Sequence, residues 1–387
     1  MVRSFPRLGL FALVTLAIAS PVVACGSGFI DKLFAGPYDD GGTADVTMDV
    51  APPPDARCAL KHSPERPTIP DGANTPTVVF AMDAVSFDEV TAGAPLGFDL
   101  DDACTCPEDE TCVPPEGGDR RCDRSEGRDN AFGPLFGTII GQFGSPDFAT
   151  QRIRDGNYGA IISLSQWNQQ PNDPLVTIGF FTSGGLDDPP DAGKSKPRFD
   201  GTDRWTIDPE SLVSGDQLIG VDCSTSTRCV PLYADLKGYV KDDQLVARID
   251  RVPFVVSTKS GLFEIELTSV ILTAHIVREA GILRLERGEL VGRSASGRLL
   301  AAIGQLQDSV FGSDAGLCNS PGAYALAKSA ICDAVDIATA PADDKAGKSC
   351  TALSGALGFT AVQAMGGTVF STARNPNACA SFTDSCP

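Results

Sequence analysis

Histidine is scarce in this sequence, which has only His62 and His275 among its 387 residues. Because His62 falls in a stretch predicted to lie outside the folded body, a metalloenzyme centre built on two or three imidazoles is excluded. No Gly-x-Ser-x-Gly elbow and no Gly-x-x-x-x-Gly-Lys loop is present either. The sequence therefore lacks the signatures of the serine hydrolases and of the phosphate-binding loops.

Basic residues are also in short supply. The 31 Lys and Arg stand against 50 Asp and Glu, for a net charge of −19. Proteins that bind nucleic acid have to neutralise phosphates with positive charge, so we expect no nucleic-acid partner. Hydrophobic residues make up 42% of the chain and charged residues 21%, which is the composition of a globular protein.

Residues 1–24 have the features of a signal peptide. Arg3 and Arg7 supply positive charge, residues 8–19 are apolar, and small residues precede Cys25. The apolar stretch is too short to remain as a membrane-spanning helix. The pattern therefore predicts export from the cytoplasm.

The end of this segment, Val22-Val23-Ala24-Cys25, resembles the lipobox of bacterial lipoproteins. The resemblance implies that Cys25 is lipidated after residues 1–24 are removed, so that a lipid anchor attaches the protein to a membrane. Gly26 at the next position implies an outer-membrane lipoprotein that faces the periplasm or the cell surface. A plain secretory signal peptide is the alternative interpretation.

Residues 25–76 are rich in Gly, Pro, Asp and Thr, with runs such as Asp39-Asp40-Gly41-Gly42. Such a composition buries too little apolar surface to offset the loss of chain entropy on folding. We predict a flexible tether that holds the folded body away from the membrane.

Cysteine is plentiful: the chain has 13, and twelve remain when Cys25 is set aside. An even number in a protein that matures outside the reducing cytosol predicts disulfides. We expect one bridge between Cys223 and Cys229, which flank a short loop. A second is expected between Cys332 and Cys350, on two neighbouring helices.

A cysteine cluster contains Cys104, Cys106, Cys112 and Cys122. One cysteine, from this cluster or from the C-terminal region, is expected to pair with Cys58. Zinc ligation is the alternative for the cluster, but paired Cys-x-x-Cys knuckles are missing from its spacing.

Residues 77–295 alternate between apolar and polar side chains in short runs, such as Val176-Ile178-Phe180 and Phe263-Ile265-Leu267. This two-residue period predicts antiparallel β-strands. Because seven or more such strands would expose an apolar face in one flat sheet, we predict a β-sandwich of jelly-roll type. The cysteine-rich stretch 103–128 is predicted to be an insert in this domain.

Two local elements are predicted within the β domain. A short helix is expected from Phe148 to Asp155, ended by Gly156. A tight hairpin is expected in residues 283–290, with Gly288 in its turn.

Residues 296–387 are predicted to form a small, disulfide-pinned α-helical region. Leu299, Ile303 and Leu306 recur with helical spacing behind Ser296, and Ser320-Pro321 is a typical helix start. A third helix is predicted to carry Cys350, Leu353, Leu357 and Ala364 and to end near Gly366-Gly367.

Glu264 and Glu266 offer the strongest enzymatic interpretation. They lie two apart on one predicted strand, which places them roughly 6.5–7 Å apart, as in the carboxylate pairs of glycosidases. The alternative is that both are solvated surface carboxylates.

Trp167 and Trp205 stand beside polar loop residues. Exposed aromatic faces of this kind bind sugar rings or protein partners. The alternative is that both tryptophans are buried in the core.

Aspartate outnumbers glutamate by 38 to 12 and collects in loops. Around the cysteine cluster, oxygen ligands suited to Ca²⁺ are offered by Asp99, Asp101, Asp102, Asp129 and Asn130. Aspartates that cap turns are the alternative. Calcium is the one cofactor that the sequence suggests.

The order of an acidic cysteine-rich insert, the loop Gln170–Pro174 and a cysteine-containing helical tail is similar to that of uncharacterised secreted lipoproteins of myxobacteria. That resemblance implies no activity. We therefore expect a cell-envelope lipoprotein that acts as a non-catalytic binding or structural component, with a glycan or an envelope protein as partner and Ca²⁺ as support. The alternative is an extracellular carbohydrate-active hydrolase.

Overall fold

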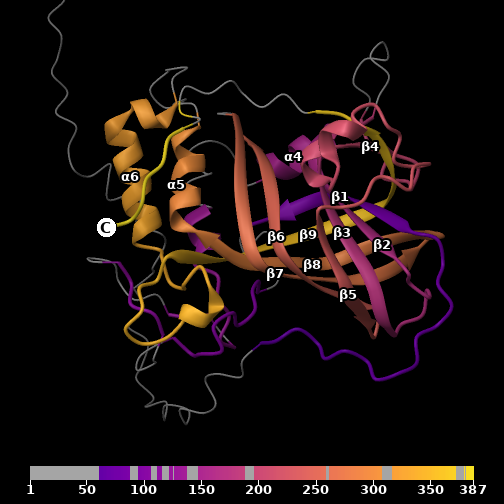
Figure 1. Cartoon of the computed structure of the whole chain (residues 1–387), viewed down its shortest axis with the longest axis horizontal. Helices are drawn as coiled ribbons and strands as arrows, with labels where there is room; N and C mark the ends of the chain where they lie inside the picture. Colours follow the sequence, from indigo (N-terminus) through magenta and orange to yellow (C-terminus); the bar gives the residue numbers. More distant parts are fainter. Residues whose placement is uncertain are drawn as a thin grey trace, which may run out of the picture. The chain divides into compact units, whose positions relative to one another are not determined.

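A single sheet dominates the folded body (Figure 1); all its strand pairs are antiparallel except that between the fourth strand, residues 204–207, and the last strand, residues 352–369, which is parallel. The computed structural model describes residues 61–87, 95–105, 111–115, 122–124, 126–136, 147–187, 196–258, 261–306, 316–371, 379 and 381–387. The predicted signal peptide, Cys25, the first part of the predicted tether and Cys58 lie outside the described residues.

The strands differ widely in length. They are β1 (Val78–Ser86), β2 (Asn157–Ser165), β3 (Asp173–Gly185), β4 (Arg204–Ile207), β5 (Tyr233–Lys241), β6 (Gln244–Thr258), β7 (Gly261–Glu279), β8 (Ile282–Ala295) and β9 (Ala352–Val369). The helices are α4 (Phe148–Arg154), α5 (Ser296–Gly304) and α6 (Pro321–Cys332), and the short 3₁₀ turns are η3 (Pro209–Ser211), η4 (Gly215–Leu218), η5 (Leu317–Asn319) and η6 (Pro341–Asp343). The prediction of a mainly β fold with few helices and with disulfides in the C-terminal region is confirmed.

The sheet closes on itself. Its hydrogen-bonded order is β1-β2-β3-β5-β6-β7-β8-β9, and β9 pairs in turn with β1. The strands therefore lie in one closed sheet and not in two stacked ones. The reason is that β6, β7 and β8 are long and each pairs along most of its length with the next, so that the normal twist of the sheet brings its ends together.

Strand β9 closes the sheet, where the sequence predicted a third helix. Every residue from Ala352 to Phe359 is buried. Leu353 and Leu357 belong to the main core, whereas Ala356 packs into a second cluster on the other face of the sheet. A strand buried on both faces shows no two-residue alternation, which is why this prediction was wrong.

Gly288 lies within β8 and not in a hairpin turn. A Cβ at this position would come within 2.5 Å of the Phe359 ring of β9. The glycine therefore admits an aromatic side chain from the neighbouring strand. The chain turns instead between β7 and β8, where Ala280 and Gly281 both have positive φ.

The helices that the sequence predicted with cap signals are present. Helix α4 begins at Phe148, α5 begins at Ser296, and α6 begins at Pro321 directly after Ser320. Figure 1 shows α5 and α6 side by side. Within the described part of the chain, no helix is both long enough and apolar enough to cross a membrane.

Four disulfides have both cysteines described. Cys223–Cys229 is confirmed. The predicted Cys332–Cys350 bridge is wrong: Cys332 pairs with Cys386, and Cys350 pairs with Cys112. The error follows from β9, because Cys350 precedes a strand of the sheet and does not lie on a helix next to α6.

The described end of the predicted tether, residues 61–76, lies against the body. The Arg66 guanidinium donates to two main-chain carbonyls and sits 4.8 Å from the centre of the Tyr239 ring. The Thr75 amide donates to the Trp167 carbonyl at 3.0 Å. This stretch therefore belongs to the folded structure, although its composition is that of a linker.

Candidate metal centre

The segment that precedes the cysteine-rich stretch packs on the outer face of the sheet. Leu96 and Phe98 form a buried cluster with Ile271, Val291 and Ala356 of β7, β8 and β9. Because Phe98 is fixed in this way, the aspartates that follow it are held next to the sheet.

Gly97 allows this segment to approach residues 128–130 closely. Its φ is +112°, and a Cβ would lie 2.8 Å from the Asp129 carbonyl oxygen. Only glycine adopts such a conformation readily. The Asp129 amide then donates to the Phe98 carbonyl at 3.0 Å, which places Asp129 opposite Asp99 and Asp101.

The carboxylates of Asp99, Asp101 and Asp129 converge. Each offers one oxygen, and these oxygens all lie within 4.8 Å of one another. The backbone positions the groups: the Asp102 amide donates to Asp99 Oδ1 at 2.8 Å, and the Leu100 amide donates to Asp129 Oδ2 at 2.7 Å. Three of the residues predicted as Ca²⁺ ligands are thus brought together.

Asp99 Oδ2 is the most informative atom of this group. Asp99 is only 5% exposed, and no described residue donates a hydrogen bond to this oxygen. A buried carboxylate oxygen without a donor is unfavourable unless a cation balances it. The site therefore has the electrostatic character of a cation-binding centre.

Two further carboxyl groups, Asp123 and Asp336, surround this site. Burial raises the pKa of Asp101 and that of Asp336 to about 7 each. Burial, reinforced by the negative charges of Asp101 and Asp336, raises the pKa of Asp129 further. Burial also raises the pKa of Asp99 and of Asp123. Ionised together, these groups repel one another, and a divalent cation would relieve the repulsion.

An all-oxygen set of carboxylates on loops is the kind of site that Ca²⁺ prefers. Two predicted ligands do not belong to it. Asn130 Oδ1 instead accepts from the Gly133 amide at 3.0 Å and from the Ala356 amide at 3.1 Å. Asp102 does not group with Asp101 and Asp129; it groups with His62 and Asp99.

The predicted aromatic platform does not form. Trp167 is 3% exposed, and its indole nitrogen donates to the Gln170 carbonyl at 3.3 Å. Trp205 is 1% exposed, because β4 lies beside the end of β9 and its ring packs near Phe199. Both tryptophans are core residues, which was the alternative interpretation of them.

Glu264 and Glu266 project from β7 on the face opposite Phe263, Ile265 and Leu267, which are buried. Both glutamates are half-buried. A carboxylate oxygen of Glu266 lies 3.7 Å from Nε of Arg298, a largely exposed side chain. The pair thus stands on a solvent-facing side of the strand.

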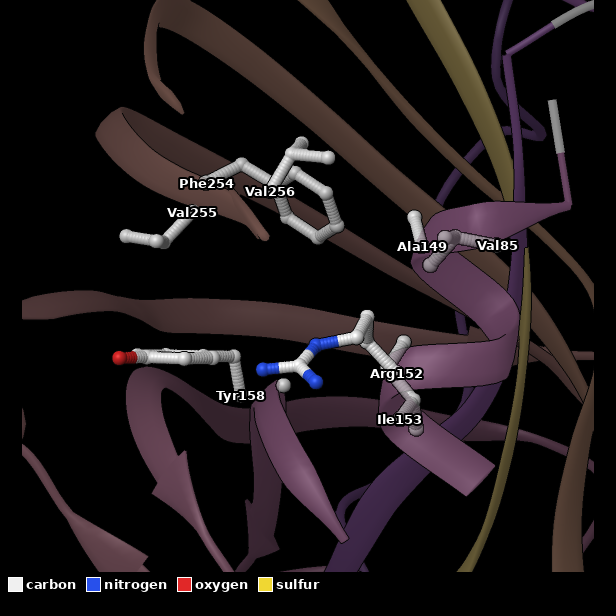
Figure 2. Close-up of a pocket in the computed structure, with 9 residues that line it drawn as sticks. Val85, Ala149, Arg152, Ile153, Tyr158, Phe254, Val255 and Val256 are labelled. Carbon is white, nitrogen blue, oxygen red and sulfur yellow. The ribbon is translucent and has the colours of Figure 1, made fainter. Parts of the chain in front are cut away.

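A small pocket lies between helix α4 and strand β6 (Figure 2). Its lining is mainly apolar, with Val85, Phe254 and Val256 among the side chains, and the Arg152 guanidinium and the Tyr158 ring project into the same region. Its lining residues include no carboxylate, although one of them, Val255, pairs across the sheet with Glu264. The pocket therefore gives the predicted acid pair no substrate cleft.

His62, Asp123 and Asp336 were not among the predicted ligands. Asp336 lies more than two hundred residues along the chain from Asp129 and reaches it only because β9 closes the sheet. The residues around Asp336 in the sequence therefore give no indication that it lies close to Asp129. His62 was assigned to the tether because of the composition around it.

Raised carboxyl pKa values predict how stability depends on pH in the absence of a metal. In EDTA, we expect the melting temperature to fall by roughly 5–10 °C from pH 5 to pH 8. A carboxyl whose folded-state pKa is above its unfolded value stabilises the fold at low pH, and this stabilisation disappears as the pH rises through about 7, where Asp101 and Asp336 ionise. Thermal unfolding at each pH measures the effect.

His275 affects the pH dependence with the opposite sign, because burial lowers its pKa and its contribution to stability therefore increases as the pH rises. The control is therefore made in a His275→Gln background, where Asp101→Asn should flatten the pH profile. An equal melting temperature at pH 5 and pH 8 would contradict this description of the site.

Comparisons with family models, with curated proteins and with solved structures find no match to this chain.

Proposed function

We propose that this protein is a lipid-anchored component of the cell envelope whose body is a non-catalytic binding or structural module supported by Ca²⁺. The observation that carries the calcium part is the convergence of Asp99, Asp101 and Asp129 around a buried oxygen of Asp99 that has no donor among the described residues. The envelope part is supported by the lipobox-like residues that end at Cys25.

Calcium at this position would reinforce the backbone bridge between Phe98 and Asp129, which already joins the two segments that carry the carboxylates. Asp99 and Asp101 lie on the segment that packs on β7–β9, and Asp129 lies about thirty residues later along the chain. An ion bound to all three carboxylates would fix the cysteine-rich region on the outer face of the sheet. Such a region is then a rigid surface for a partner.

Of the two partner classes that the sequence suggested, we propose an envelope protein. The exposed aromatic rings that would bind a sugar or a protein are not available, because both Trp167 and Trp205 are buried. Protein partners do not require such a platform.

The calcium part is tested by thermal unfolding in Ca²⁺ and in EDTA at pH 7.5. At a Ca²⁺ concentration about 100 times the dissociation constant, binding adds about 2.7 kcal/mol, which corresponds to a melting temperature higher by roughly 5–10 °C. Asp101→Asn should lose most of this shift. Asp216→Asn, at an exposed position, is the matched control and should keep it; an equal response of the two variants would refute the assignment.

The anchor is tested by fractionation of cells that produce the full chain. The wild-type protein should sediment with membranes and incorporate labelled fatty acid, whereas Cys25→Ser should do neither. Membrane association of Cys25→Ser at the wild-type level would show that the protein is not a lipoprotein.

A further inference from the structure

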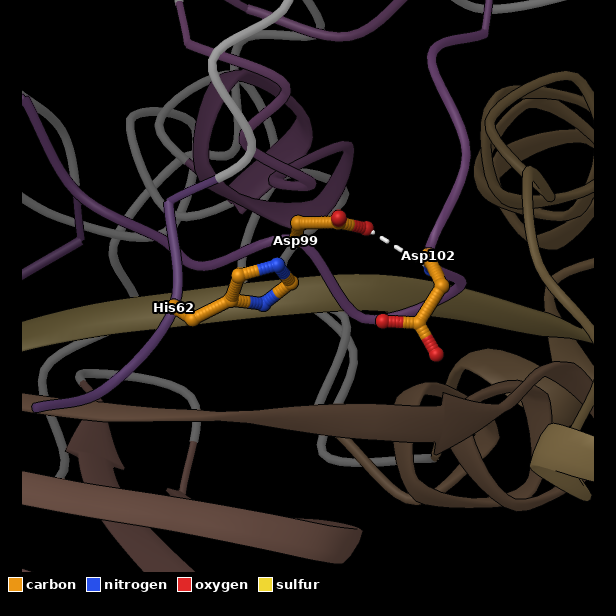
Figure 3. A group of neighbouring side chains, drawn as sticks. All are labelled: His62, Asp99 and Asp102. Atoms are coloured by element: carbon orange, nitrogen blue, oxygen red, sulfur yellow. Dashed lines mark hydrogen bonds between the residues drawn. The ribbon is translucent and has the colours of Figure 1, made fainter. Parts of the chain in front are cut away.

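His62 stands next to Asp99, one of the residues of the candidate calcium site (Figure 3). One imidazole nitrogen of His62 and one carboxylate oxygen each of Asp99 and Asp102 lie within 4.8 Å of one another. His62 and Asp102 are exposed, and Asp99 is buried. The group therefore opens toward solvent from a buried carboxylate.

The backbone around His62 is held firmly. The Lys61 carbonyl accepts from the Asp99 amide at 3.0 Å, and the Lys61 amide donates to the Glu126 carbonyl at 3.0 Å. The Lys61 ammonium group is 2.9 Å from a Glu289 carboxylate oxygen and 4.6 Å from the centre of the Phe98 ring. The contacts of Lys61 thus hold His62 beside Asp99, and the His62 ring itself need not make any contact.

Asp102 is positioned by the turn that follows Asp99. Its φ is +56°, and its amide donates to Asp99 Oδ1 (Figure 3). Oδ1 of Asp99 also accepts from the Asp101 amide at 3.3 Å. This oxygen therefore already accepts two hydrogen bonds. Oδ2 is buried and has no donor among the described residues, so it is the oxygen available to a cation.

We propose that His62, Asp99 and Asp102 form a second cation position, which takes a borderline divalent ion such as Zn²⁺. One imidazole and two carboxylates suit Zn²⁺, whereas the all-oxygen set of the candidate calcium site suits Ca²⁺. Three protein ligands leave a further position for water or for a group from a partner. Because His62 and Asp102 are exposed, their side chains can close on an ion without disturbing the core.

The two positions share Asp99, whose Oδ2 is the oxygen available to either ion. The inference rests on the proposed calcium site only through this shared residue. Its consequence concerns the chain that precedes the body: an ion on His62 would fasten residues 61–63 to the turn at residues 99–102. A metal would then add to the contacts that already hold the described end of the predicted tether against the body.

The test is Zn²⁺ binding to the full chain, measured by competition with a chromophoric chelator in saturating Ca²⁺. We expect His62→Gln to weaken the tightest Zn²⁺ binding at least tenfold. His275→Gln removes the other histidine of the chain, which is half-buried on β7, and should bind Zn²⁺ as the wild type does. Co²⁺ as a probe should show an absorption spectrum that changes in His62→Gln only.

Paired variants separate this inference from the proposed calcium site. Asp102→Asn should lose Zn²⁺ and keep Ca²⁺, whereas Asp101→Asn should lose Ca²⁺ and keep Zn²⁺. Wild-type Zn²⁺ affinity in His62→Gln, or in Asp102→Asn, would overturn the inference and leave the calcium site standing. If the protein binds no Ca²⁺ but binds Zn²⁺ in a way that depends on His62, the calcium site would be refuted and the second cation position would stand. Because His62 and Asp102 are exposed, their variants should keep the wild-type circular dichroism spectrum.

Discussion

Replacing Arg293 by methionine is expected to lower the free energy of unfolding by about 3–5 kcal/mol, or the melting temperature by roughly 10 °C. The guanidinium is 1% exposed and forms an ion pair with Asp344, which is 2% exposed. It also donates to the Ala338 carbonyl at 2.7 Å and to the Leu100 carbonyl. Methionine would leave Asp344 as a buried charge without its partner.

Arg298 provides the matched control for this variant. It is 68% exposed, and its Nε lies 3.7 Å from Glu266, so Arg298→Met should cost less than about 1 kcal/mol. The double variant Arg293→Met/Asp344→Leu should recover part of the loss, because it removes both charges. Equal unfolding midpoints for Arg293→Met and Arg298→Met, in chemical denaturation, would contradict the structural role of the buried pair.

Removing the Cys112–Cys350 disulfide, by replacing both cysteines with alanine, is expected to cost about 2–5 kcal/mol. The two cysteines are 238 residues apart in sequence, and the bridge ties the cysteine-rich region to the start of β9. The neighbouring backbone supports the same attachment, since the Val113 amide donates to the Lys348 carbonyl at 2.7 Å. Loss of the bridge would raise the conformational entropy of the unfolded chain. It would also remove a link that holds the cysteine-rich region, and with it the acidic residues, next to β9.

The Cys223–Cys229 bridge is the control, because it closes a loop over a separation of only six residues. A cross-link over a short separation restricts the unfolded chain less, so the corresponding double alanine variant should be destabilised less. Chemical unfolding of both variants gives the comparison. A larger loss for the Cys223–Cys229 variant would show that Cys112–Cys350 does not hold the structure as described.

The mainly β fold was predictable wherever a strand has one apolar face. Strand β7 alternates clearly, with Phe263, Ile265 and Leu267 buried and the intervening glutamates more exposed. Strand β9 was not predictable in the same way, because neighbours cover both of its faces. The closure of the sheet, and with it the partner of Cys350, depends on this one strand.

The candidate site was predictable in part. Asp99, Asp101 and Asp129 flank the cysteine-rich stretch, and cross-linked loops rich in aspartate indicate where hard cations bind. His62 and Asp336 reach the site through contacts formed only in the folded chain, and no spacing along the sequence indicates them. Trp205 was misleading because its burial results from the pairing of β4 with β9.

The most direct test of the calcium site is the calcium content of the purified full chain, measured by elemental analysis after removal of metal with EDTA and dialysis against Ca²⁺ at pH 7.5. Both proteins carry Asp102→Asn, which removes the second cation position. The protein with only this change should retain about one more Ca²⁺ per chain than the protein that also carries Asp101→Asn and Asp129→Asn. Equal calcium in both proteins would contradict the central claim and would leave these aspartates as groups that shape the turns of the cysteine-rich region.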